Sequence, residues 1–227
     1  MQIAKGGSMQ VSKNVWQVGG SGLTAPEDAA IYLVRFGDAA ALIDAGCGGG
    51  TQKLCAHVGR VIPKQVAVTH LFLTHCHFDH TGGAEQVRRR LGCKVVAHRL
   101  DAVFLETGDS NVTAAAWYGE RMAPLRVDHQ IEGPQEVIPV GSGEITAFHC
   151  PGHSPGSVVY VADIDSQRVL FGQDVHGPLH PDLLSDRADY VRSLGFILEL
   201  NADILCEGHF GVFRGRREIR RFIESYR

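Results

Sequence analysis

Short apolar runs alternate along the chain with stretches of helical periodicity. Two β-type runs, 31–36 and 40–44, are joined by a Gly-Asp turn, which predicts a hairpin. Further strands are expected within 70–75, 94–98, 135–150, 156–172 and 202–209. Helices are expected within 49–62 from Thr51, within 82–92 up to Gly92, within 185–200 from a cap at Ser185 or Asp186, and within 214–227.

The order of these elements predicts one domain over residues 1–227. Strands alternate with helices in each half, which favours an α/β fold of two sheets packed face to face with helices outside. Residues 99–130 interrupt this order, and their sequence predicts two short helices and a loop rather than sheet. We expect this insertion, with Trp117 and Tyr118, to form a wall of the substrate site.

Composition narrows the possible partners. The 227 residues are 44% hydrophobic, enough for a substantial core, and the formal net charge of -3 provides no basic stripe for nucleic acid. No apolar run reaches the roughly 18 to 20 residues of a membrane span, and the first residues given have no apolar core of the signal-peptide type. Six cysteines without a C-x-x-C pair indicate reduced thiols. We expect a cytoplasmic protein with a small-molecule partner. The oligomeric state is left open, with a homodimer as one alternative.

Twelve histidines are the unusual feature, and three of them lie in "THCHFDH" at 74–80. In an extended segment side chains repeat every two residues, so His75 and His77 are expected to project to the same side and share one metal ion. Asp79 and His80 follow where the chain turns into the helix expected near Gly82. They are expected to face a second ion.

Two metal shells need more ligands than this segment supplies. Three downstream candidates sit beside glycines at predicted strand ends, namely His153, Asp174 and His209. The seven ligands then divide into His75, His77 and His153 on one ion, and Asp79, His80 and His209 on the other, with Asp174 bridging.

The pattern H-x-H-x-D-H, followed by separate His, Asp and His, resembles the metallo-β-lactamase superfamily and is most similar to its glyoxalase II-like branch. The resemblance extends from "LIDAG" at 42–46 through "PGHSPGS" at 151–157 to the final "GH" at 208–209. It implies a four-layer αββα sandwich with the metals at one edge of the paired sheets.

Several other polar residues receive lesser roles. Asp44 is expected to orient a metal-binding imidazole. His176 and His180 are candidates for contacting substrate, with ordinary loop positions as the alternative. Cys76, Cys150 and Cys206 are predicted to be small buried hydrophobes. The remaining histidines are interpreted as ordinary polar residues, and the arginines of 214–221 mainly as a solvated helix face, with anionic substrate binding as the alternative.

A donor set of imidazoles and carboxylates suits two zinc ions, with iron or manganese as alternatives. A metal-bridging hydroxide is expected to cleave a thioester, lactone or other ester, with Asp79 as proton acceptor or orienting group. Glutathione thioesters are not expected, because the chain ends one helix after His209 and lacks the helical domain with which glyoxalase II binds glutathione. β-Lactams are not expected either, because the first motif of those enzymes commonly lacks the histidine found at His80.

Alternative functions remain. A mononuclear non-haem iron enzyme similar to persulfide dioxygenases would use a subset of the same ligands. "GHSPG" at 152–156 matches a nucleophile elbow, with Ser154, Asp174 and His209 in the order of a serine hydrolase. The β-branched run after Ser157 predicts a strand where an elbow needs a helix, so this alternative is disfavoured. A nuclease is disfavoured because the chain has no excess of positive charge for binding nucleic acid. A non-catalytic binding protein is disfavoured because all seven ligands are present.

Overall fold

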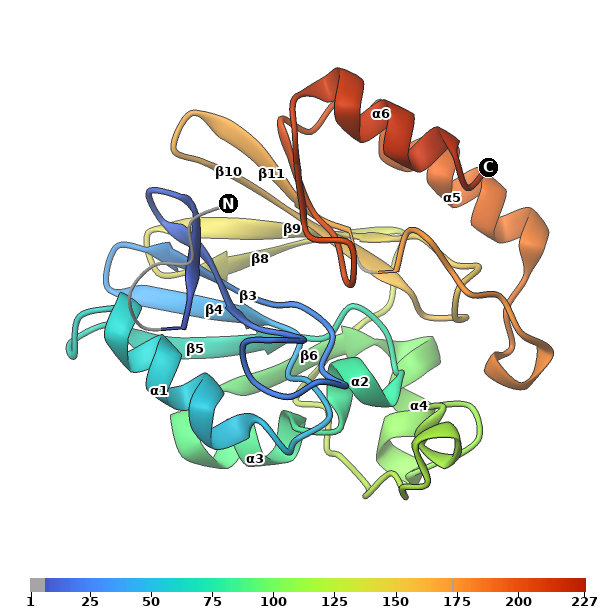
Figure 1. Ribbon diagram of the computed structural model, residues 1–227, viewed down its shortest axis with the longest axis horizontal. Coiled ribbons are helices and arrows are strands. Elements are labelled where there is room, and N and C mark those ends of the chain that lie inside the picture. The colour runs from blue at the N-terminus through green and yellow to red at the C-terminus, as the bar shows by residue number, and fades with distance from the viewer. Residues whose placement is uncertain (1–6, 173) are drawn as a thin grey trace.

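The computed structural model describes residues 7–172 and 174–227, and in these residues the strands form two sheets (Figure 1). The first sheet contains, in spatial order, β1 (Met9–Ser12), β2 (Val15–Gly19), β3 (Ile31–Phe36), β4 (Ala39–Ile43), β5 (Ala67–Phe72), β6 (Lys94–His98) and β7 (His129–Ile131). The second contains β13 (Val212–Arg214), β12 (Ile204–Cys206), β11 (Gln167–Phe171), β10 (Val158–Ile164), β9 (Gly143–His149) and β8 (Gln135–Val140).

Helices cover the outer face of each sheet. Those on the first sheet are α1 (Thr51–Val61), α3 (Ala84–Leu91) and α4 (Arg99–Thr107), and those on the second are α5 (Arg187–Glu199) and α6 (Arg216–Glu224) (Figure 1). The sheets lie between these two helical layers. The predicted four-layer αββα sandwich is therefore confirmed.

Three apolar layers fill the spaces between the four structural layers, because neighbouring residues of a strand face opposite sides. Leu71 of β5 packs toward the helices, whereas the next residue, Phe72, packs between the sheets. Val159 of β10 packs toward α5, whereas Tyr160 packs between the sheets. Strands buried on both faces explain the continuous apolar runs in the sequence.

Parallel pairing brings several strand ends to one edge. In the first sheet β4, β5, β6 and β7 run parallel, and in the second β11 runs parallel to β12. The segments after β4, β5, β11 and β12 carry the candidate residues Asp44, 74–80, Asp174 and His209. His153 lies in the connection between β9 and β10.

Local predictions were confirmed in part. Asp186 is the N-cap of α5, its side chain accepting a hydrogen bond from Asp189 N at 2.8 Å, and Gly92 ends α3 with a positive φ of 71°. The prediction for 99–130 was wrong at its end, since His129 and Gln130 belong to β7 and pair with β6. A single 3-10 helix, η1 (Ala115–Tyr118), follows α4 in place of a second α-helix.

The helix predicted from Gly82 is α3, which begins at Ala84. A short helix, α2 (Phe78–Thr81), precedes α3, so Asp79 and His80 lie on a helical turn. No prediction covered β1, β2 and β13, which are short strands of three to five residues; β1 and β2 form a hairpin, and β13 folds back on β12. Among the described residues, no helix is both long and apolar enough to cross a membrane.

Candidate metal centre

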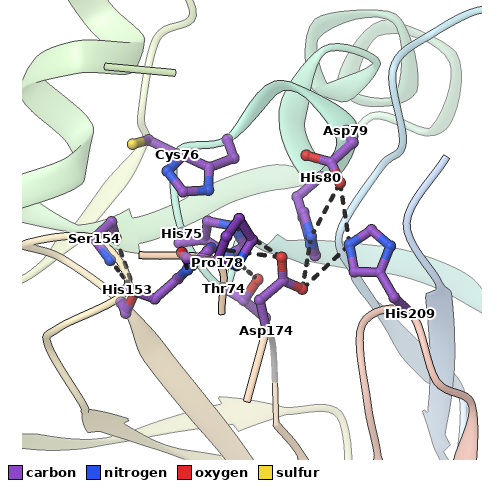
Figure 2. A network of polar contacts seen from close by, with 12 residues as sticks. Thr74, His75, Cys76, Asp79, His80, His153, Ser154, Asp174, Pro178 and His209 are labelled. Atoms are coloured by element: carbon purple, nitrogen blue, oxygen red, sulfur yellow. Dashed lines mark hydrogen bonds and ion pairs between the residues drawn. The ribbon is translucent and has the colours of Figure 1, made fainter. Parts of the chain in front are cut away.

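The structure brings the seven predicted ligands together at one edge of the paired sheets. Figure 2 labels six of them, namely His75, Asp79, His80, His153, Asp174 and His209. Potential donor atoms of His75, His77 and His153 lie within 4.8 Å of one another, and we call these residues the three-histidine cluster. Donor atoms of Asp79, His80, Asp174 and His209 lie equally close, and we call these residues the mixed cluster.

The three-histidine cluster is buried. The three imidazoles are at most 4% exposed, and their ring centroids lie 4.5–4.7 Å apart. Among the described residues, none of the three Nε2 atoms has a hydrogen-bond partner. Buried polar atoms are unfavourable when they lack a partner. Three such atoms facing one another therefore fit a divalent ion bound at this point.

Burial also selects the ligating form of these imidazoles. Desolvation and the neighbouring histidines, His80 for His75 and His153 for His77, hold the pKa of His75 and of His77 well below their usual range. Neutral imidazole keeps the lone pair that a metal needs. His75 and His77 do converge as the two-residue spacing predicted, and Cys76 between them is fully buried.

The mixed cluster holds opposite charges. His80 Nε2 lies 3.1 Å from Asp174 Oδ1, and His209 Nε2 lies 3.1 Å from Asp79 Oδ2 and 3.4 Å from Asp174 Oδ1. The second Asp174 oxygen faces the other cluster, 3.5 Å from His153 Nε2 and 4.0 Å from His75 Nε2. Asp174 thus lies between the two clusters, as the bridging prediction requires (Figure 2).

The carboxylates of the mixed cluster stay ionised. Burial opposes ionisation of Asp174, but the nearby His80 outweighs it and holds the Asp174 pKa well below its usual range. Asp79 has a lowered pKa for the same reason. Burial is likewise outweighed at His209, whose pKa the two aspartates raise to about 10. Anionic oxygens are the donors that divalent ions bind, so this cluster also fits a metal.

Hydrogen bonds orient the imidazoles from behind. Asp44 Oδ2 accepts from His80 Nδ1 at 2.7 Å and from Thr74 Oγ1 at 2.8 Å, which supports the orienting role predicted for it. His153 Nδ1 lies 2.9 Å from the Pro178 carbonyl oxygen. Such partners fix the tautomer so that Nε2 carries the lone pair.

Glu207 was missed by the sequence interpretation. It is fully buried, and its Oε2 accepts from the backbone N–H groups of His209 and Phe210, both at 2.7 Å. Its Oε1 pairs with His176 Nδ1 at 2.8 Å. An acidic residue two positions before the last ligand, in a strand end next to glycine, was the available signal.

The two histidines proposed for substrate contact lie in different surroundings. His176 packs beside His209, with ring centroids 5.1 Å apart, and its hydrogen bond to Glu207 gives it a place behind the mixed cluster. His180 is exposed and its ring lies edge-on to Trp117, with centroids 5.2 Å apart. Only His180 is therefore positioned at the rim formed by the insertion.

A cavity of about 530 Å³ is connected to the mixed cluster through Phe78, which precedes Asp79, and through Tyr118, whose hydroxyl interacts with Asp79, while the seven ligands are not among its lining residues. Its lining residues are Glu27, Cys47, Gly48, Gly49, Phe78, Gln86, Tyr118 and Glu120. Burial and the neighbouring Asp79 raise the pKa of Tyr118, whose ring also packs against Phe78 with centroids 5.7 Å apart. The insertion contributes Tyr118 and Glu120 to this cavity wall, whereas Trp117, expected there as well, is not among the lining residues and packs against His180.

Residues given no ligand role lie outside both clusters. The remaining histidines make other contacts, His57 with Val18 O, His70 with Thr69, His129 with Glu136, and His98 in a stack on His149. Cys150 and Cys206 are buried, as predicted. Arg216, Arg220 and Arg221 pair with Asp203, Glu224 and Glu218 on an exposed face.

Ser154 does not have the surroundings of a nucleophile. It is fully buried, and its hydroxyl donates to Asp101 Oδ2 at 2.6 Å rather than to a histidine. Strand β10 follows it at Val158, where a nucleophile elbow would have a helix. This geometry argues against the serine hydrolase alternative.

Comparison with known proteins assigns the family. The sequence model of the metallo-beta-lactamase superfamily matches residues 25–209. The chain is 30% identical to acyl-coenzyme A thioesterase MBLAC2 of Gallus gallus, over 87% of this chain and 78% of that protein. It is 33% identical to hydroxyacylglutathione hydrolase of Anaeromyxobacter dehalogenans, over 59% of this chain and 42% of that protein.

Solved structures share the fold. A metallo-beta-lactamase from Cronobacter sakazakii superposes with a TM-score of 0.80 at 19% identity, covering 96% of this chain and 93% of that one. A subclass B3 metallo-beta-lactamase of Bradyrhizobium japonicum gives a TM-score of 0.78 at 20% identity, covering 97% and 90%. Fold, family match and gathered ligand pattern agree, and the chain belongs to the metallo-β-lactamase superfamily.

Proposed function

We propose that this metallo-hydrolase cleaves a small-molecule thioester with the help of two divalent ions, zinc in the first place. The observation that carries the proposal is the pair of adjacent donor clusters. Three buried imidazoles with free Nε2 atoms lie beside a carboxylate-rich set, and Asp174 directs one oxygen toward each. One ion in each cluster uses all seven side chains.

Bound divalent ions supply a Lewis acid for a carbonyl oxygen and lower the pKa of bound water from about 15.7 to about 7. The chain's own residues then need no nucleophilic side chain. Ser154 is buried with its proton engaged by Asp101, and burial with nearby acids raises the pKa of Cys47 to about 12. Neither group is suited to attack a carbonyl at neutral pH.

Asp79 is placed to orient the reacting water. Its carboxylate contacts His209 Nε2 at 3.1 Å and lies beside Tyr118 at the cavity wall. Both roles expected for Asp79, proton acceptor and orienting group, remain part of the proposal.

Two arguments support a thioester among the possible acyl substrates. A thiolate leaving group has a reference pKa of about 8.5, so its departure needs no strong acid from the protein. A thioesterase aligned over 78% of its length and a hydroxyacylglutathione hydrolase are among the relatives. Lactones and oxygen esters would use the same residues and form the comparison set.

The test is metal content measured on protein purified without added metal, followed by assays with matched thioester, oxygen ester and lactone substrates. We expect zinc, thioester cleavage that a chelator abolishes, and recovery when zinc is returned. Chelator-resistant cleavage with an acyl group on Ser154, detected by mass spectrometry, would contradict the proposal. Iron content with oxygen consumption on a persulfide would instead identify the dioxygenase alternative.

A further inference from the structure

A buried carboxylate outside both clusters joins the two loops of the three-histidine cluster. Asp101 lies in the first turn of α4 and is 1% exposed. Its Oδ2 accepts from Cys76 N at 2.8 Å and from Ser154 Oγ at 2.6 Å, and its Oδ1 accepts from Gly156 N at 2.6 Å. None of these contacts involves a predicted ligand directly.

The three groups that donate to Asp101 belong to the loops that carry the histidines of the three-histidine cluster. Cys76 is the residue between His75 and His77, and Ser154 directly follows His153. Asp101 therefore bonds both loops that supply the three imidazoles, one after β5 and one between β9 and β10. The same two loops have a second link, the hydrogen bond from Val158 N to Thr74 O at 2.7 Å.

The surroundings of Asp101 are built for a carboxylate. Ser154 donates its single proton to Asp101, so the 2.8 Å contact between the two serine hydroxyls is a donation from Ser157 to Ser154. Ser157 Oγ in turn accepts from Ser154 N at 3.0 Å. A buried carboxylate is tolerated when hydrogen bonds satisfy its oxygens, and each oxygen of Asp101 has at least one.

Close approach is also required at this point. A Cβ atom added to Gly156 would lie 2.6 Å from Asp101 Oδ1 and 2.5 Å from Asp101 N. Glycine thus allows the loop after His153 to lie directly on the first turn of α4. An amide in place of the carboxylate would present one acceptor oxygen where three donors converge, leaving at least one N–H or O–H unmatched.

We propose that Asp101 is a positioning residue for metal binding, which sets the distance between the His75–His77 loop and the His153 loop. The inference rests on the proposed function, because it assumes that the three-histidine cluster binds an ion. It assigns to the insertion a role at the metal centre in addition to its place at the cavity wall. Asp101 acts through backbone and hydroxyl groups, without touching substrate.

The experiment compares Asp101→Asn and Ser154→Ala with the wild-type chain. Zinc affinity of the metal-free proteins is measured by competition with a chromophoric chelator, and cobalt absorption reports the ligand geometry. Repeating each titration in a His209→Ala background removes a donor from the mixed cluster, so that the three-histidine cluster is observed. Asp165→Asn is the control, since Asp165 also accepts three hydrogen bonds, from Ser12 Oγ, Asn14 N and Asn14 Nδ2, away from the site.

We expect Asp101→Asn to weaken zinc binding at the three-histidine cluster by about 10 to 100-fold, the effect typical of a lost supporting partner, and to alter the cobalt spectrum. Ser154→Ala should give a smaller loss in the same direction, and it decides the matter if Asp101→Asn does not fold. The control should bind zinc like the wild type even if its melting temperature falls.

Two results would overturn the inference and are distinguishable. Wild-type zinc affinity in the folded variants, whatever their stability, would show that Asp101 serves packing alone while the proposed function stands. A wild-type chain that takes up no metal would overturn both.

Discussion

The two halves of the candidate centre offer a metal ion different chemistry. The three-histidine cluster has only imidazole donors, at most 4% exposed, with a lowered pKa at His75 and His77. The mixed cluster has ionised carboxylates, and its His209 side chain is 34% exposed. One half offers desolvated lone pairs and the other offers negative charge, with Asp174 between them.

Their supports differ in the same way. His75 contacts Thr74 Oγ1 at 3.0 Å and His153 contacts a backbone carbonyl, so neutral groups support the three-histidine cluster directly. Asp44 and Glu207, both buried carboxylates, support His80 and the His209 loop. Asp44 contacts a ligand imidazole directly, whereas Asp101 reaches the three-histidine side only through backbone and hydroxyl groups.

The largest effect is expected at Asp174, the residue that faces both clusters. Asp174→Ala should abolish turnover and remove tight binding of both ions, because one carboxylate faces both clusters. Metal content and hydrolysis of the best thioester measure this. Asp163→Ala is the control, since its exposed pair with Arg168 is of a kind worth about 0–1 kcal/mol. Retention of one tightly bound ion would show that Asp174 serves a single cluster.

Removing one histidine from each cluster should distinguish the two clusters by the size of the loss in metal affinity. His77→Ala is expected to release one ion and to lower its affinity more than about 100-fold, because no water replaces a fully buried donor easily. His209→Ala should cost less, since the site is open enough for water to take the position. Zinc titrations measure both, with His129→Ala as a surface control. Equal losses would contradict the distinction drawn from exposure.

Glu207→Gln should act on the mixed cluster alone. The amide nitrogen cannot accept hydrogen bonds, so either the backbone N–H groups of His209 and Phe210 or His176 lose their partner. We expect zinc affinity at this cluster to fall by about 10 to 100-fold. Glu106→Gln is the matched control, because Glu106 accepts from Val127 N and from Gln130 Nε2 away from the centre. An equal loss at the three-histidine cluster would be the contrary result.

The smallest effect concerns the pH dependence of stability at His98, the N-cap of α4, which carries Asp101. Burial, His149 and Arg99 lower the pKa of His98 to about 4, and its Nδ1 accepts from Leu100 N at the start of α4. Because the folded state resists protonation, stability should be lost as pH falls from about 6.5 toward 4.

In His98→Asn, which keeps an oxygen to accept from Leu100 N, this loss should be smaller. A difference in unfolding free energy of order 1 kcal/mol between the two proteins corresponds to about 2–4 °C in melting temperature at pH 4.5. Scans at pH 7 and 4.5 in the same metal state measure it. Parallel pH dependence in the two proteins would show that His98 does not contribute.

The local predictions succeeded where the sequence pattern carries its own geometry. The two-residue spacing of His75 and His77 predicted their convergence, and glycines beside His153, Asp174 and His209 marked loops that approach one another. They failed at β7, which pairs with β6 across the intervening insertion, and no prediction covered the N-terminal hairpin. Asp101 and Glu207 were missed because a supporting role depends on which backbone groups lie opposite, and no spacing encodes that.

The sequence by itself determined the family pattern and the alternation that builds two sheets between helices, and it predicted which seven side chains the fold would bring together. Only the tertiary structure decided how those donors divide by charge and exposure, and which carboxylates support each half. The physical reason is the distance along the chain between the residues in contact. Periodicity and motif spacing express contacts within a few residues, whereas the Asp101 and Asp174 contacts join segments tens of residues apart, and only packing of the sheets brings these together.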